Sequence, residues 1–128
     1  MHARMIRKLV LILALTTSLS AAPPPLDSAT RQLIHDIYKQ LIEINTTDSA
    51  GNTTTAAEAM AGRLRAAGFA ASDVQILAPN PRKVNLVARL RGSTSEKPLL
   101  LLAHLDVVEA KREDWSMDPF TFTEQDGY

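Results

Sequence analysis

The fold is decided by the stretch LLLLAHLDVV, residues 99–108, the most apolar run outside the N-terminal segment. The pair Lys97-Pro98, which favours a turn, precedes it. Four leucines followed by a small residue are typical of a strand that is buried on both faces, as in a parallel sheet. We therefore predict a central strand that ends at His104 and Asp106.

These two polar residues are the main candidates for a functional site. Because side chains alternate along a strand, His104 and Asp106 are expected on the same face. Ligand sites of open α/β sheets form at the carboxyl ends of the strands. An imidazole nitrogen is a good zinc ligand, and a nearby carboxylate can accept the other ring N–H and fix the tautomer. The alternative is a histidine at a strand end that is simply satisfied by a hydrogen-bonded aspartate.

Other titratable residues could contribute ligands. The acidic residues of the following loop either ligate a metal or form a solvated surface: Glu109, Glu113, Asp114 and Asp118. His35 has no second histidine one helical turn later and is expected near the surface. Catalytic zinc takes three protein ligands and a water, and the chain has no cysteine. The missing ligands are therefore expected downstream of Tyr128.

Helical patterns dominate the first half of the chain. Apolar residues at helical spacing follow a good N-cap, Asp27 or Ser28, and predict a helix that extends to about residue 44. A polar loop follows over residues 45–54. Thr55 and Glu58 have the spacing of a capping box, and Gly68 stands where a helix would end. This pattern predicts a second helix over residues 55–67.

The second half of the chain predicts strands. Apolar and β-branched residues cluster over residues 74–77 and 84–90, and Pro79 and Pro81 separate the two clusters. Residues 120–123 alternate as a short strand, and a turn signal follows at 126–127. Since no partner strand follows that turn, we expect the chain to stop inside a domain.

The N-terminus predicts export. Basic residues up to Lys8 precede an apolar run over residues 9–19, and small residues follow it. We expect residues 1–22 to be a signal peptide and residues 23–26 to be a linker. A run of eleven residues is too short to cross a bilayer comfortably, since crossing takes roughly 20. No stable membrane span is therefore expected after cleavage, although an uncleaved anchor is the alternative. The mature protein is expected to be secreted or periplasmic.

Charge and cysteine content exclude other classes. Removal of the signal takes away three of 14 basic residues and none of 14 acidic ones, which leaves a formal charge of −3. Nucleic acid is therefore an unexpected partner. Without cysteine, stability must come from packing or from a metal.

The sequence around His104 resembles the M20 metallopeptidases, which include carboxypeptidases, dipeptidases, aminoacylases and deacetylases. Their signature is an apolar strand, a small residue and H-x-D, which residues 100–108 match. Similarity extends to VNLVARL at 84–90, to Trp115 with 118–120, and to DGY at 126–128. The resemblance implies a three-layer α/β/α zinc-peptidase catalytic domain with a mixed, mostly parallel sheet. Residues 27–128 would be its N-terminal part, incomplete at the C-terminal side.

The resemblance also implies roles for particular residues. His104 would be a zinc ligand, and Asp106 a catalytic carboxylate that orients it. The complete protein would bind two zinc ions, cleave a peptide or an N-acyl amino acid, and be able to form a homodimer. The sequence His-Leu-Asp-Val-Val, residues 104–108, is most similar to the carboxypeptidase-like branch. Because the remaining ligands and the general base are absent, the 128-residue chain is expected to be inactive by itself. The alternative is a non-catalytic exported binding module that retains the fold.

Overall fold

The computed structural model describes residues 24–127, so the predicted signal peptide lies outside the described residues. The chain divides into two units, residues 1–31 and 32–128. Among residues 24–127, no helix is both long and apolar enough to cross a membrane. The first unit contributes the capped beginning of helix α2, and the second contains everything else that is described below.

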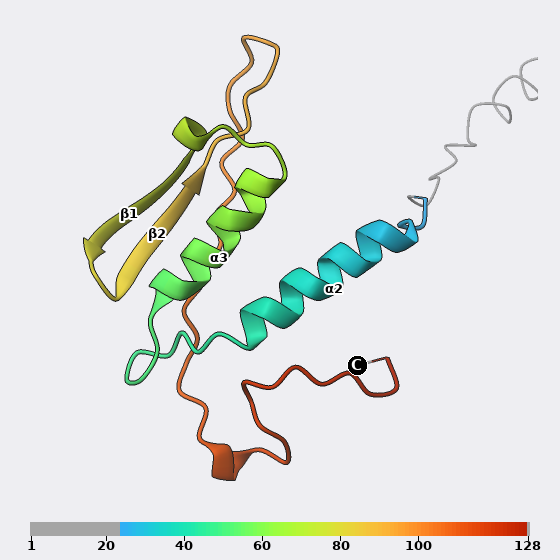
Figure 1. The fold of residues 1–128 in the computed structure, drawn as a ribbon, viewed down its shortest axis with the longest axis vertical. Helices are drawn as coiled ribbons and strands as arrows, with labels where there is room; N and C mark the ends of the chain where they lie inside the picture. Colours follow the sequence, from blue (N-terminus) through green and yellow to red (C-terminus); the bar gives the residue numbers. More distant parts are fainter. Residues whose placement is uncertain (1–23, 128) are drawn as a thin grey trace, which may run out of the picture. The chain divides into compact units, whose positions relative to one another are not determined.

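Helix α2, Ser28–Ile42, begins where its cap residue predicts (Figure 1). Asp27 accepts hydrogen bonds from the Thr30 amide and from the Thr30 hydroxyl, both at 2.8 Å. These bonds hold the pKa of Asp27 below its usual range. The helix ends two residues before the predicted end. None of its residues is buried, and Leu33, Ile34 and Tyr38 are each about half exposed.

Helix α3, Thr53–Ala66, begins two residues before the predicted start. Its N-cap is Asn52, whose side chain accepts a hydrogen bond from the Thr55 amide at 3.2 Å. The predicted capping box is therefore wrong, because the asparagine three residues before Thr55 takes the capping role. Gly68 follows the helix with φ +95°, which only glycine adopts without strain.

Strands β1, Val74–Asn80, and β2, Lys83–Ala88, form an antiparallel hairpin. The register pairs Val74 with Ala88 and Leu77 with Asn85, and it becomes irregular between Leu77 and Asn80. Pro79 lies in this irregular part and has no N–H to donate to the ladder. The segment between the two strands is therefore shorter than predicted, because β1 continues past Pro79 to Asn80.

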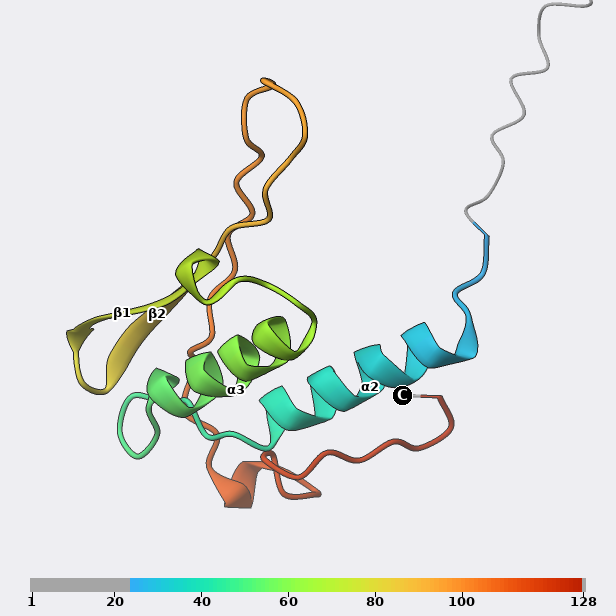
Figure 2. The same cartoon turned by 45° about the horizontal axis from the view of Figure 1, so that its top comes forward.

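Helix α3 packs on the hairpin and forms the core with it (Figures 1 and 2). The buried hydrophobic residues of the helix are alanines, Ala56, Ala57 and Ala61, and those of the strands are Val74 and Val84. Small side chains let the helix approach the strands closely. The helix is also tied to β2 by Thr53, whose hydroxyl donates to the Val84 carbonyl and accepts from the Val84 amide at 2.9 Å.

The described residues are mixed α and β, but their sheet is not the predicted one. It contains two antiparallel strands where a mostly parallel sheet was expected. Neither the 99–108 run nor residues 120–123 form a strand. A strand needs a neighbour for its N–H and C=O groups, and no described strand pairs with either segment. The three-layer domain remains a prediction.

Candidate functional site

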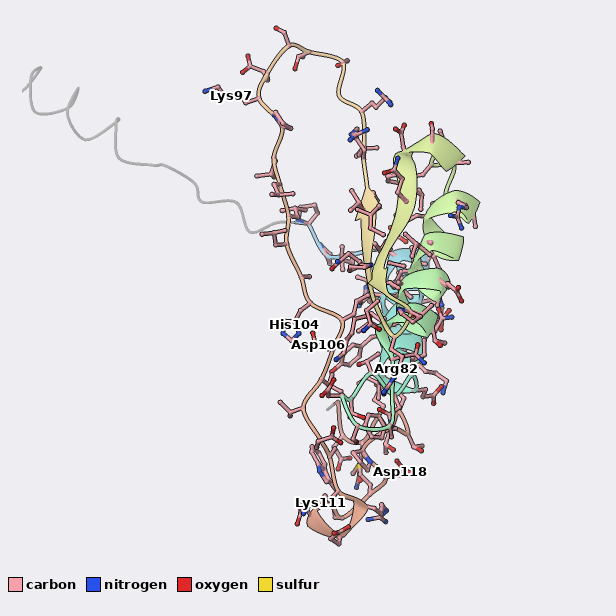
Figure 3. All side chains as sticks on the ribbon, turned by 90° about the vertical axis from the view of Figure 1, so that its left-hand side faces the viewer. Arg82, Lys97, His104, Asp106, Lys111 and Asp118 are labelled. Carbon is pink, nitrogen blue, oxygen red and sulfur yellow. The ribbon has the colours of Figure 1, made fainter. Side chains whose placement is uncertain are left out.

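The 99–108 run is an exposed, extended segment. Its four leucines, residues 99–102, are 75–86% exposed, so the expected burial on both faces is wrong for this chain. Figure 3 shows the run as a separate stretch alongside the hairpin, with His104 and Asp106 close together on it. The run and strand β2 line a groove of about 910 Å³, and both candidate residues belong to its lining.

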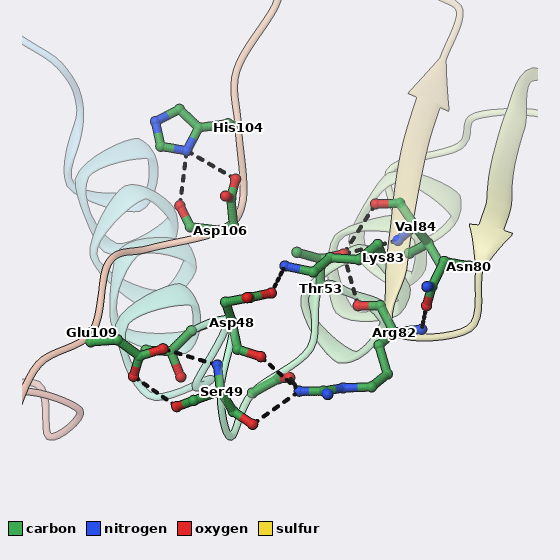
Figure 4. Close-up of polar contacts among 12 residues, drawn as sticks. Asp48, Ser49, Thr53, Asn80, Arg82, Lys83, Val84, His104, Asp106 and Glu109 are labelled. Carbon is green, nitrogen blue, oxygen red and sulfur yellow. Dashed lines mark hydrogen bonds and ion pairs between the residues drawn. The ribbon is translucent and has the colours of Figure 1, made fainter.

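His104 and Asp106 face each other within this segment. His104 Nδ1 lies 2.8 Å from the main-chain carbonyl of Asp106 and 3.3 Å from its carboxylate (Figure 4). A carbonyl oxygen can only accept a hydrogen bond, so Nδ1 must carry the proton that it donates. In the neutral ring the lone pair then resides on Nε2. Both side chains are open to solvent, with 84% of His104 and 59% of Asp106 exposed.

This arrangement fits one ligand of a zinc site. Zinc is bound by the unprotonated nitrogen of a neutral imidazole whose other N–H is held by a carbonyl or carboxylate, and Nε2 of His104 has that character. The described residues contain no group of three or more histidine, cysteine, aspartate or glutamate side chains that could hold a metal. Residues 24–127 can therefore supply one ligand of such a site, His104. The assignment of His104 as a ligand and of Asp106 as a catalytic group remains a prediction.

A loop from earlier in the chain holds the segment that carries the pair. Thr46 Oγ1 donates to the Leu105 carbonyl at 2.7 Å. The amide and the hydroxyl of Ser49 donate to the Glu109 carboxylate at 2.9 and 2.8 Å. Glu109 is thus engaged with this loop, which makes it a poorer candidate ligand than the sequence suggested.

The same loop, residues 45–51, is fastened to the hairpin turn on its other side (Figure 4). Arg82 Nη2 faces the main-chain carbonyls of Asp48, Ser49 and Gly51 at 2.9, 3.3 and 2.7 Å. Lys83 Nζ lies 2.6 Å from the Asp48 carboxylate, and this ion pair holds the pKa of Asp48 below its usual range. The 45–51 loop therefore connects the hairpin to the candidate site.

The sequence carried a local signal for this loop, but not for its contacts. Asn45 Oδ1 accepts from the Thr47 amide at 2.9 Å and from the Thr47 hydroxyl at 2.7 Å, which is a side-chain-closed turn of the kind that asparagine favours. The polar composition of residues 45–54 thus indicated a loop. Nothing in the pattern indicated that Thr46 and Ser49 reach residues about 60 positions away.

The remaining candidates lie apart from the pair. His35 on α2 contacts Asp36 and Glu124 at 3.3 and 3.5 Å and packs edge-on against Phe122. The pKa of Asp36 is lowered mainly by a hydrogen bond from Gln32 and, to a smaller extent, by the one from His35.

The acidic residues of the loop and Trp115 also lie elsewhere. Asp118 caps a turn by accepting from the Phe120 amide. Glu113 and Asp114 are exposed in the short helix η2, Arg112–Asp114. Trp115 lines a hollow of about 400 Å³ together with residues of α2.

Comparison with known proteins found two curated relatives. The chain is 34% identical over 97 residues to an acetylornithine deacetylase of Proteus mirabilis, and 35% identical over 96 residues to one of Erwinia tasmaniensis. The alignments cover 72% and 71% of this chain and 24% of each relative, so the chain spans about a quarter of the length of these proteins. No family model matches the chain, and no solved structure matches it significantly. The similarity supports the resemblance to the M20 family, but not to its carboxypeptidase-like branch.

Proposed function

We propose that this chain is the N-terminal part of the catalytic domain of a zinc-dependent hydrolase that cleaves the amide bond of an N-acyl amino acid. Two curated relatives bear the name acetylornithine deacetylase, and this favours an N-acyl amino acid over a peptide as substrate. A carboxypeptidase-like reaction, suggested by the sequence around His104, is the second candidate for the activity. Export to a periplasm or out of the cell rests on the pattern of residues 4–22.

The observation that carries the proposal is the direction of His104. With Nδ1 donating to Asp106, the lone pair of Nε2 is free to bind a cation. The complete protein would hold two zinc ions, one of them through His104. Bound zinc would polarise the substrate carbonyl and lower the pKa of a bound water so that it can attack near neutral pH.

The residues of this chain supply orientation and charge. The main-chain carbonyl of Asp106 keeps the proton on Nδ1 of His104. The Asp106 carboxylate places a negative charge beside the ring, which favours binding of a cation at the opposite nitrogen. The general base and the other ligands would come from sequence beyond residue 128. A homodimer of the complete protein is part of the same proposal.

The test uses the complete protein and compares His104→Ala with wild type. We expect the variant to lose zinc, measured by metal analysis after dialysis, and to lose hydrolysis of N-acetylated amino acids. His35→Ala is the matched control, because it removes a histidine that lies apart from the site. Unchanged zinc content and an unchanged rate in His104→Ala would refute the proposal. A complete protein without zinc or amide hydrolysis would favour a binding module instead.

A further inference from the structure

Few contacts connect the candidate site to the rest of the described chain. Among residues 24–127, the hydrogen bonds that join segment 99–109 to the rest of the chain come from Thr46 and Ser49. They meet the segment on either side of Asp106, at Leu105 and at Glu109. The side chains of the neighbouring leucines are mostly exposed and so provide little packing. The direction of His104 and Asp106 therefore depends on the 45–51 loop.

Thr46 holds the peptide unit between the two candidate residues. Leu105 separates His104 from Asp106, and its carbonyl accepts from Thr46 Oγ1 at 2.7 Å. Fixing this carbonyl fixes the plane of the peptide bond that joins Leu105 to Asp106. Thr46 itself is only 3% exposed, so its hydroxyl has a defined direction and cannot easily exchange its partner for water.

The loop that carries Thr46 is held by the core. Arg82 fastens it to the hairpin turn through three main-chain carbonyls. Gly51 lies so close to Asn45 that an added Cβ would be 2.3 Å from the Asn45 carbonyl oxygen. Because the loop is closed this tightly, Thr46 holds Leu105 at a fixed position relative to the hairpin.

We propose that Thr46 is a positioning residue: through the Leu105 carbonyl it holds His104 and Asp106 in the geometry that binds metal. This inference rests on the proposed function, because the metal is the expected ligand of His104. Thr46 touches neither the metal nor the substrate, and it acts through the main chain of the segment.

The test compares Thr46→Val with Thr47→Val in the complete protein. Both threonines are buried, at 3% and 2% exposure, and both substitutions replace a buried hydroxyl with a methyl group. The Thr47 hydroxyl, however, bonds within its own loop, to Asn45. Thr47→Val is therefore a control for the general cost of altering this loop. Thr46→Ser, which retains the hydroxyl, is the rescue variant.

Two measurements are made on each variant. The backbone mobility of residues 103–109, followed by NMR relaxation in metal-free protein, should rise in Thr46→Val, because the Leu105 carbonyl is no longer held by the Thr46 hydroxyl. Zinc affinity, measured by competition with a chromophoric chelator, should fall about tenfold, as for loss of a residue that supports a metal ligand. Thr47→Val and Thr46→Ser should be close to wild type in both measurements.

The outcomes separate this inference from the proposed function. Unchanged backbone mobility of residues 103–109 in Thr46→Val, or an equal loss of zinc affinity in Thr46→Val and Thr47→Val, would refute the positioning role. If His104→Ala loses zinc while Thr46→Val retains it, the proposed function stands and only the role of Thr46 is wrong. If His104→Ala binds zinc as tightly as wild type, both proposals are wrong.

Discussion

His104 takes its orientation mainly from a main-chain acceptor. Its Nδ1 lies closer to the Asp106 carbonyl than to the Asp106 carboxylate, at 2.8 against 3.3 Å. A main-chain carbonyl neither titrates nor disappears on substitution. The tautomer that frees Nε2 should therefore survive changes of the Asp106 side chain, and the carboxylate is left to act through its charge.

A substitution at Asp106 can separate these two effects. In the complete protein, Asp106→Asn should lower kcat by about 10- to 100-fold, while zinc affinity falls much less because the carbonyl still holds the ring. Steady-state kinetics and zinc competition measure the two quantities. Asp118→Asn is the control, since an amide oxygen can still accept from the Phe120 amide. Parallel losses of zinc and of kcat would show that orientation depends on the carboxylate.

Asp73 predicts a pH dependence of stability. Its side chain is 9% exposed, and Arg91 donates two hydrogen bonds to it, at 2.9 and 2.7 Å. These bonds, with the positive charges of Arg91 and Arg89, lower the pKa of Asp73 from 3.8. Because the folded-state pKa is the lower one, this stabilisation is present above about pH 4 and is lost as pH falls through the folded-state pKa.

Asp73→Asn should accordingly lower the melting temperature at pH 6, and the difference from wild type should shrink below pH 3.8. Thermal melts between pH 2.5 and pH 6, monitored by circular dichroism, give the comparison. Glu96→Gln, at an exposed turn, should melt like wild type across this range. A difference that stays constant with pH would contradict the ion-pair explanation.

Two glycines predict changes of opposite sign. A Cβ at Gly51 would meet main-chain atoms of Asn45 at 2.3 and 2.6 Å, so Gly51→Ala should cost about 1–3 kcal/mol of unfolding free energy. A Cβ at Gly62, within α3, would meet nothing within 4 Å. Gly62→Ala should therefore stabilise by about 0.5–1 kcal/mol. Urea unfolding of both variants measures these changes, and a neutral Gly51→Ala would mean that the 45–51 loop is less tightly closed.

At the scale of elements, the helices were predictable and the leucine run was not. Helical periodicity and caps are local, so α2 began where Asp27 indicated, and α3 began only two residues early. The hairpin strands were also found near their predicted positions. A strand in the 99–108 run depends on neighbours far along the sequence, and its hydrophobicity could not reveal that residues 24–127 provide none.

The cap of α3 gives a prediction for this scale. Asn52→Ala removes the acceptor of the Thr55 amide and should cost about 1 kcal/mol of unfolding free energy. Asn52→Asp keeps an acceptor at the same position and should cost much less. Urea unfolding distinguishes the two variants. If both cost the same, capping by this side chain does not contribute to stability.

At the scale of the whole molecule, the sequence identified the candidate pair but not its support. His104 and Asp106 could be found because two polar residues interrupt an apolar run. Thr46 and Ser49 could not, because their partners lie 59 and 60 residues away and only the folded chain brings them together. Arg82 resembles any surface arginine in the sequence, and its three carbonyl contacts exist only after the loop has closed.

The exposed leucines have a practical consequence for anyone who prepares this 128-residue chain. Leu99 to Leu102 are 75–86% exposed, and Leu101 and Leu102 line a groove with β2, a strand that, within residues 24–127, pairs on one edge only. An apolar segment beside an open strand edge is where intermolecular pairing begins. Concentrated samples will tend to aggregate from this point, and a lysine in the leucine segment would act as a gatekeeper against it.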